Sequence, residues 1–142
     1  GPPPPALAEL RGRPVLLFFW AHWCGDCKAQ GPVIARLAAK YGPRGLAVLA
    51  PTRLYGTGKD DAEATPQTEQ ARIAEVLAES YPGFEEIPVP VSEAAMVRYG
   101  ASATPTLVLV DRAGRVRLYT PTRMTEAELE RRIEELLAEP AS

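Results

Sequence analysis

The two cysteines of this chain lie close together. Cys24 and Cys27 are separated only by Gly25 and Asp26, a spacing that two cysteines placed at random in 142 residues would reach about once in 70 times. Thiols three residues apart at the opening of a helix are placed to form a small disulfide ring. At that helix start, unpaired N–H groups and the positive end of the dipole would stabilise a Cys24 thiolate, whereas Cys27 would be more buried. The pair therefore predicts thiol–disulfide exchange in which Cys24 attacks and Cys27 resolves.

Two other uses of a cysteine pair fit these residues less well. A purely structural disulfide across so short a ring would remove little chain entropy and would stabilise the fold weakly. A zinc site needs four ligands, and His22 is the single histidine left to join the two thiols. The sequence therefore predicts redox chemistry with neither a metal nor a cofactor.

The residues around the pair predict the elements that hold it. Residues 15–20 form a continuous apolar and aromatic run, as expected of a central strand buried on both faces. Apolar residues then recur at helical spacing up to Tyr41, where Gly42-Pro43 ends the run, and Pro32 should kink this helix. Residues 46–50 predict a second buried strand, so the order implies a parallel pair joined by a right-handed crossover.

The rest of the chain completes an α/β layout. We expect a long polar loop at 51–65, a helix at 65–81 and a short edge-like strand at 88–91. A brief helix at 92–99 should follow, with Met96 and Val97 pointing inward. A β-hairpin is expected at 106–119, and a final helix begins at the capping box of Thr125 and Glu128. The expected fold class is α/β, with a mixed central sheet of four or five strands and helices on both faces.

Composition limits the partners. The net charge of -2 gives no support to nucleic acid, because phosphate binding needs a clustered positive surface. The longest apolar run, residues 15–21, is too short to span a bilayer. Residues 1–5 predict extended polyproline, and without an initiator Met or a signal segment we expect a trimmed or processed start. The length suits a linker at 1–9 and one domain at 10–142.

A longer motif around the cysteines resembles the active-site segment of thioredoxins. It runs Phe19-Trp20-Ala21-His22-Trp23-Cys24-Gly25-Asp26-Cys27-Lys28, and Pro32 matches the proline that kinks their active-site helix. A second mark is Ala103-Thr104-Pro105-Thr106 directly before the hairpin. The resemblance implies that the Thr104–Pro105 peptide bond is cis, that Pro105 faces the cysteine pair, and that the backbone before it pairs with a bound polypeptide. It also implies an enzyme that exchanges disulfides with protein thiols and with an upstream redox partner.

Residues 51–91 exceed the plain thioredoxin connection, and this layout looks like the TlpA/ResA group of thiol:disulfide oxidoreductases. The resemblance implies a thioredoxin fold with a helix-plus-strand insert that shapes the surface near the reactive sulfurs. It implies an extracytoplasmic location, periplasmic or in the cell envelope, often behind a membrane tether that the proline run would suit, and we expect a monomer. Within the insert, Tyr55 with Gly56 and Gly58 predicts either a mobile aromatic loop near the cleft or an ordinary turn.

One departure from thioredoxins concerns the resolving thiol. Phe18 stands where they carry a buried Asp that relays a proton. Because a phenyl ring accepts no proton and burial disfavours a Cys27 thiolate, either another base acts, such as water or one of the carboxylates in or next to the insert (Glu85, Glu86, Glu93), or Cys27 deprotonates slowly. This loss keeps open a binding or chaperone-like module with incidental redox activity. A peroxide-reducing enzyme is less favoured, since the chain has no peroxidatic segment.

The second departure is Asp26, where thioredoxins have Pro. Its charge disfavours a nearby Cys24 thiolate, which predicts a reducing potential nearer about -270 mV than about -120 mV. His22 is either a cation that offsets Asp26 or a solvated residue without a role. We expect Trp23 on the docking surface and Trp20 in the core.

Overall fold

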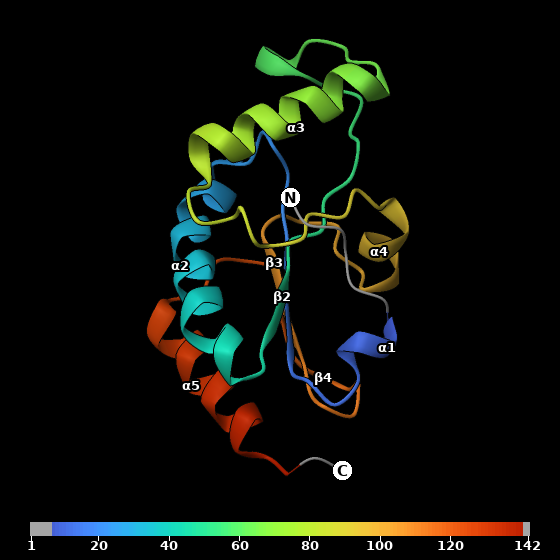
Figure 1. Ribbon diagram of the computed structural model, residues 1–142. Helices are drawn as coiled ribbons and strands as arrows, with labels where there is room; N and C mark the ends of the chain where they lie inside the picture. The colour runs from blue at the N-terminus through green and yellow to red at the C-terminus, as the bar shows by residue number, and fades with distance from the viewer. Residues whose placement is uncertain (1–6, 141–142) are drawn as a thin grey trace.

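A four-stranded mixed sheet forms the centre of the protein, as seen in a computed structural model that describes residues 7–140 (Figure 1). The strand order is β2-β1-β3-β4. Strand β1 (Val15–Phe19) pairs in parallel with β2 (Ala47–Leu49) and antiparallel with β3 (Thr106–Val110), and β3 pairs antiparallel with the edge strand β4 (Val116–Thr120). The predicted parallel pair and hairpin are confirmed. The polyproline run lies outside the described residues.

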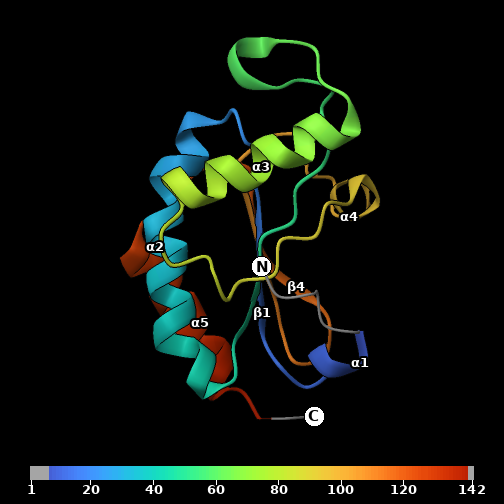
Figure 2. The ribbon, with the colours of Figure 1, turned by 45° about the horizontal axis from the view of Figure 1, so that its top comes forward.

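Helices cover both faces of the sheet. Helices α2 (Gly25–Tyr41) and α5 (Glu126–Ala138) lie along one face, and the short α1 (Leu7–Leu10) and α4 (Glu93–Arg98) lie on the other (Figures 1 and 2). Helix α3 (Pro66–Ser80) crosses one end of the sheet, and short 3-10 turns span Gly42–Arg44 and Lys59–Asp61. The predicted α/β class is confirmed. No helix within residues 7–140 has the length and apolar character needed to cross a membrane.

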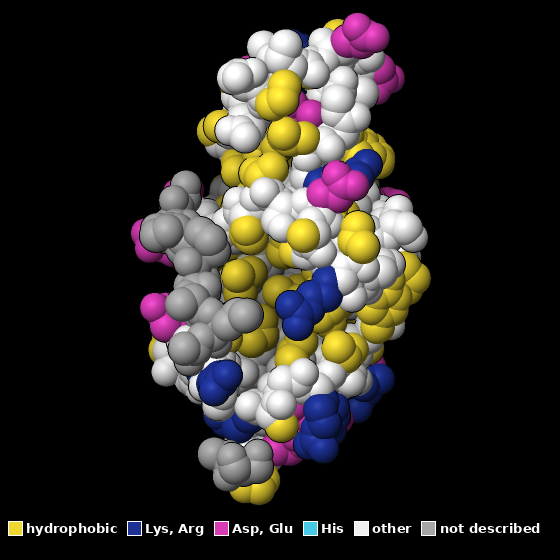
Figure 3. Space-filling model, turned by 90° about the vertical axis from the view of Figure 1, so that its right-hand side faces the viewer, with side chains coloured by type: hydrophobic (Ala, Val, Ile, Leu, Met, Phe, Trp, Pro, Cys, Tyr) yellow, Lys and Arg dark blue, Asp and Glu magenta, His cyan; other side chains and the backbone are white. Residues whose placement is uncertain are grey.

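The burial of the strands follows their sequence pattern. Every residue of β1 and β3 is buried, as their uninterrupted apolar runs predict for central strands, whereas every residue of β4 is exposed or half-exposed at the edge. The short helices α1 and α4 leave their face of the sheet hollowed, and Figure 3 shows apolar side chains in the hollow. There, a cavity of about 530 Å³ is lined in part by Leu10, Val15, Leu17, Tyr99 and Val110.

The insert packs onto the core beside α2. Thr65 caps α3 by accepting a hydrogen bond from the Thr68 N–H through its side chain. Apolar residues of the insert join the same core cluster as Phe18 and Trp20: Ile73, Val76, Tyr81, Phe84 and Ile87. Residues 20–24, which join β1 to α2 and end at Cys24, form the redox loop. This loop is thus flanked by residues that the insert supplies.

Two expectations within the insert and α4 are wrong. Residues 88–91 run beside 50–52 but form only an isolated bridge between Thr52 and Val91, so they add no strand to the sheet, whose four strands agree with the expected four or five. Pro88 and Pro90 accept hydrogen bonds from Ala50 and Thr52 at 2.9 Å, yet they have no N–H to donate, so no regular ladder forms.

In α4 only one of the two residues expected to point inward is buried. Met96 is buried, but Val97 is 72% exposed. Consecutive residues of a helix point about 100° apart, and a helix of six residues buries only a narrow stripe. Val97 therefore belongs to the surface.

Candidate active site

Cys24 and Cys27 are joined in a disulfide at the start of α2, with their Cα atoms 5.3 Å apart. Cys24 is the N-cap residue of the helix, and its Sγ accepts a hydrogen bond from the Cys27 N–H at 3.1 Å. This is the expected position for thiolate stabilisation, because an unpaired helix N–H and the positive dipole end both point at one sulfur. The geometry separates the roles of the two residues.

Their burial follows the predicted order, but Cys24 is less open than expected. Cys24 retains 6% of its surface and Cys27 retains none. Part of the cover over Cys24 comes from Thr104, whose carbonyl oxygen lies 3.4 Å from the Cys24 sulfur. The part of the pair that remains accessible to a partner therefore belongs to Cys24.

The Thr104–Pro105 segment lies against the reactive sulfur although it is 80 residues away in sequence. Its peptide bond is cis, as the family resemblance implies. The Thr106 hydroxyl donates to the Ala103 carbonyl at 2.6 Å and closes the turn before β3. Strand β3 pairs directly with β1, so the sheet register brings the two motifs together.

The exposed side of the pair carries charge. Asp26 is 70% exposed in the first turn of α2, and its Oδ1 lies 3.7 Å from Arg123, which precedes α5. Gly25 is open to solvent on the same side. Arg123 partly balances the anionic effect of Asp26 on the neighbouring sulfur, a compensation that the sequence pattern did not indicate.

On the inner side, aromatic rings surround the position of the missing Asp. Phe18 is fully buried, with its ring centroid 6.0 Å from that of Phe84 and 6.5 Å from that of Tyr81. The Tyr81 hydroxyl is buried without a hydrogen-bond partner, and burial raises the pKa of Tyr81.

The three carboxylates suggested as bases lie on the surface. Glu85, Glu86 and Glu93 are all exposed, and Glu93 pairs with Arg53 at 3.3 Å. None of them makes a hydrogen bond to Cys27 in the described part of the chain. The expectation that one of them serves the resolving thiol gains no support from their placement.

A different carboxylate of the insert is buried beside the redox loop. Glu69 of α3 lies 2.9 Å from His22 Nε2, and the two residues are 1% and 2% exposed. His22 is therefore not a solvated residue, and that alternative is wrong. Sequence reasoning missed Glu69, although it precedes Ile73 by one helical turn and so shares the apolar face of α3.

The aromatic residues take the expected places. Trp20 is fully buried and Trp23 is 52% exposed. Tyr55 packs edge-on against Trp23 with ring centroids 5.3 Å apart, so the insert loop does reach the site. Gly56 has φ of +80°, a conformation that glycine adopts without strain, and it turns the chain after Tyr55.

Comparison with known proteins places this geometry in a family. The model of a thioredoxin-like domain matches residues 5–137. The chain belongs to the thioredoxin-like family. The thiol-disulfide oxidoreductase ResA of Geobacillus kaustophilus is 26% identical over 130 residues, which cover 92% of this chain and 67% of the relative. The thioredoxin-like protein slr1139 of Synechocystis is 32% identical over 96 residues, or 68% of this chain and 73% of the relative.

A solved structure agrees with this assignment. The crystal structure of a putative thiol:disulfide interchange protein DsbE from Chlorobium tepidum is 27% identical, covers 93% of this chain and 85% of its own, and superposes with a TM-score of 0.75. This thioredoxin-like protein is a thiol-disulfide oxidoreductase, with its Cys24–Cys27 pair in the CxxC arrangement.

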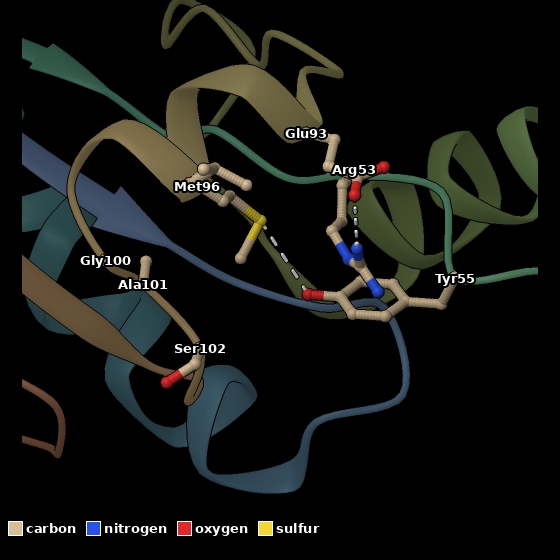
Figure 4. Close-up of a pocket in the computed structure, with 8 residues that line it drawn as sticks. Arg53, Tyr55, Glu93, Met96, Gly100, Ala101 and Ser102 are labelled. Carbon is tan, nitrogen blue, oxygen red and sulfur yellow. Dashed lines mark hydrogen bonds and ion pairs between the residues drawn. The ribbon is translucent and has the colours of Figure 1, made fainter.

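Next to the redox loop of this thioredoxin-like domain lies a pocket of about 480 Å³ (Figure 4). Its lining combines Arg53 and Tyr55 of the insert, residues of α4, and the turn at 100–102 that leads to Thr104. Tyr55 forms the wall on the side of Trp23. No group of three or more His, Cys, Asp or Glu side chains within the described chain is arranged to hold a metal ion.

Proposed function

We propose that this protein reduces disulfides in protein substrates, with Cys24 as the attacking thiolate and Cys27 as the resolving thiol. The observation that carries the proposal is the position of Cys24 Sγ, which accepts the Cys27 N–H at 3.1 Å and lies 3.4 Å from the Thr104 carbonyl. Helix and turn thus converge on one sulfur. Trp23 and the Thr104–Pro105 backbone would contact the substrate, while His22, Gly25 and Asp26 shape the loop.

The reaction balances as two exchange steps. Cys24 thiolate attacks one sulfur of a substrate disulfide, a mixed disulfide forms, and the other substrate sulfur leaves as a thiolate. Cys27 then loses its proton and attacks Cys24 Sγ, which releases the second substrate thiol. Two electrons have passed to the substrate, and the Cys24–Cys27 disulfide must be reduced by an upstream dithiol partner. Because Cys27 is fully buried, it reaches only Cys24 and does not compete for substrates.

The reducing direction rests on Asp26. An anion close to the helix start weakens the Cys24 thiolate and so stabilises the disulfide form relative to the dithiol. We therefore expect a midpoint potential nearer about -270 mV than about -120 mV. Titration against glutathione measures it, and a midpoint above about -180 mV contradicts the reducing assignment.

The setting of the protein is part of the proposal. We infer one domain over residues 10–142 with an insert at about 51–91, a linker at 1–9 that runs into helix α1 (Leu7–Leu10), and a monomeric state. A proline-rich linker suits a domain held away from a membrane tether, and the resemblance to the TlpA/ResA group favours an extracytoplasmic location.

Two single substitutions test the mechanism. Cys24→Ser should abolish insulin reduction, because no other exposed thiol can attack. Cys27→Ser should accumulate mixed disulfides with insulin that dithiothreitol releases, because resolution is blocked. Insulin reduction that survives Cys24→Ser, or a Cys27→Ser variant that forms no dithiothreitol-sensitive adduct, would show the mechanism to be wrong.

A further inference from the structure

Glu69 is the best-connected buried carboxylate beside the redox loop. Its Oε2 accepts hydrogen bonds from His22 Nε2 at 2.9 Å and from the Tyr55 N–H at 2.8 Å, and its Oε1 accepts from the Gly56 N–H at 2.8 Å. These donors come from two segments, the loop after β1 and the loop after β2. One side chain of α3 therefore ties both loops together.

The hydrogen bonds keep this carboxylate ionised in spite of its burial. Burial alone raises the pKa of Glu69, but the Tyr55 N–H, His22 and the Gly56 N–H outweigh it and hold the pKa below its usual range. A buried carboxylate with three donors is costly to replace, because an amide offers only one acceptor oxygen. A buried, charged side chain thus holds the backbone of residues 55–56 in place through hydrogen bonds.

What Glu69 fixes is the one aromatic contact of Trp23 among the described residues. Tyr55 packs edge-on against Trp23, and the Arg53 guanidinium lies 4.4 Å from the Tyr55 ring centroid. The Tyr55 hydroxyl points to Met96 Sδ, which lies 3.9 Å away, and Figure 4 shows this contact. Tyr55 thereby forms a wall between the exposed Trp23 and the pocket beside α4, held by contacts on several sides.

We propose that Glu69 is a positioning residue for protein substrates: it fixes Tyr55 against Trp23 and so holds the docking wall next to Cys24. The inference rests on the proposed exchange with protein disulfides. The occupant of this wall is a polypeptide segment that flanks a substrate cysteine and packs apolar side chains on the Trp23–Tyr55 pair. A small disulfide reaches Cys24 without touching Tyr55, so the two substrate classes should respond differently to the loss of Glu69.

The test compares second-order rate constants for insulin and for 2-hydroxyethyl disulfide. In Glu69→Gln the ratio of the insulin constant to the small-disulfide constant should fall about fivefold, the scale of losing one ordered aromatic contact. Glu79→Gln makes the same chemical change at an exposed position of α3 and should leave the ratio unchanged. A lesion that merely loosens the fold lowers both constants together, so an unchanged ratio in Glu69→Gln overturns the proposal.

A second variant shows whether Glu69 acts through Tyr55. Tyr55→Ala leaves the buried carboxylate in place and should lower the ratio by a similar factor, and Glu69→Gln should lower it no further in that background. A full additional loss in the double variant, or an unchanged ratio in Tyr55→Ala, overturns the inference. Failure of the wild-type protein to reduce insulin while it reduces the small disulfide would instead overturn the proposed function.

Discussion

Opposite charges flank the exposed side of Cys24. Asp26 lies in the first turn of α2, where an anion favours the helix but opposes a thiolate at the N-cap. Arg123 lies 3.7 Å from it, and both side chains are more than half exposed, so solvent and salt weaken the pair. We therefore expect each of these residues to shift the redox potential of the site by a small, salt-dependent amount.

Removing the anion should make the protein more oxidising. In Asp26→Asn the Cys24 thiolate becomes more favourable, the dithiol state gains stability, and the midpoint potential should rise by about 10–20 mV at low salt. Arg123→Gln leaves Asp26 unbalanced and should lower the potential by a similar or smaller amount. Titration against glutathione at two salt concentrations measures both changes. A potential that falls in Asp26→Asn would contradict the electrostatic account.

For single residues, the sequence predicts which side chains react better than it predicts which side chains hold the reactive ones in place. The spacing of Cys24 and Cys27 is a local pattern, and the exposure of Trp23 follows from its place beside them. The partner of His22 is Glu69, 47 residues away in sequence. No motif in the sequence around either residue predicts that the two side chains pair. A lone Glu in a helix is normally solvated, so only its coincidence with the apolar face of α3 could have signalled burial.

Among the elements, α2 depends on a glycine to pack against the insert. A Cβ placed on Gly31 would lie 2.8 and 2.9 Å from ring carbons of Tyr81, which is fixed among Phe18, Trp20 and Phe84. A rigid ring in a filled cluster cannot move aside at small cost. Because Gly31 has no side chain, the Tyr81 ring at the end of α3 can pack directly against α2.

Gly31→Ala should therefore destabilise the protein despite the better helix propensity of alanine. We expect a loss of about 1–3 kcal/mol in the free energy of unfolding, as for overpacking in a core. Gly42→Ala is the matched control, because Gly42 ends the same helix with φ of -53° and open space around its Cβ position. Urea denaturation compares the two variants. Equal stabilities would mean that the Tyr81 ring yields.

The elements that the sequence misplaced are short ones. A strand at 88–91 has the right side chains for a sheet edge but lacks two backbone donors, so it makes isolated contacts with residues 50–52 instead. Val97 in α4 is apolar yet exposed, because six residues give too little periodicity to tell the buried side from the open one. Longer elements such as α2 and α3 repeat their pattern enough to be predicted.

For the molecule as a whole, the insert is attached through both polar and apolar contacts. The Trp20 N–H donates to the Pro51 carbonyl at 3.2 Å, and the Thr52 hydroxyl donates to the Trp20 carbonyl at 2.6 Å. Ile73 of α3 lies in the same buried cluster as Cys27. A segment that shares its core with the redox pair should fold together with it.

A single cooperative transition is the expected consequence. Ile73→Ala removes a side chain that is 4% exposed and should cost about 2–5 kcal/mol, whereas Glu79→Ala, at an exposed position of α3, should cost little. If the insert and the sheet unfold as one unit, circular dichroism and tryptophan fluorescence will give coincident transitions in urea, shifted together to a lower midpoint. An independent insert would instead lose helix first, and the Ile73→Ala variant would show an early transition in circular dichroism while the fluorescence of buried Trp20 held. That separation would contradict a single domain over residues 10–142.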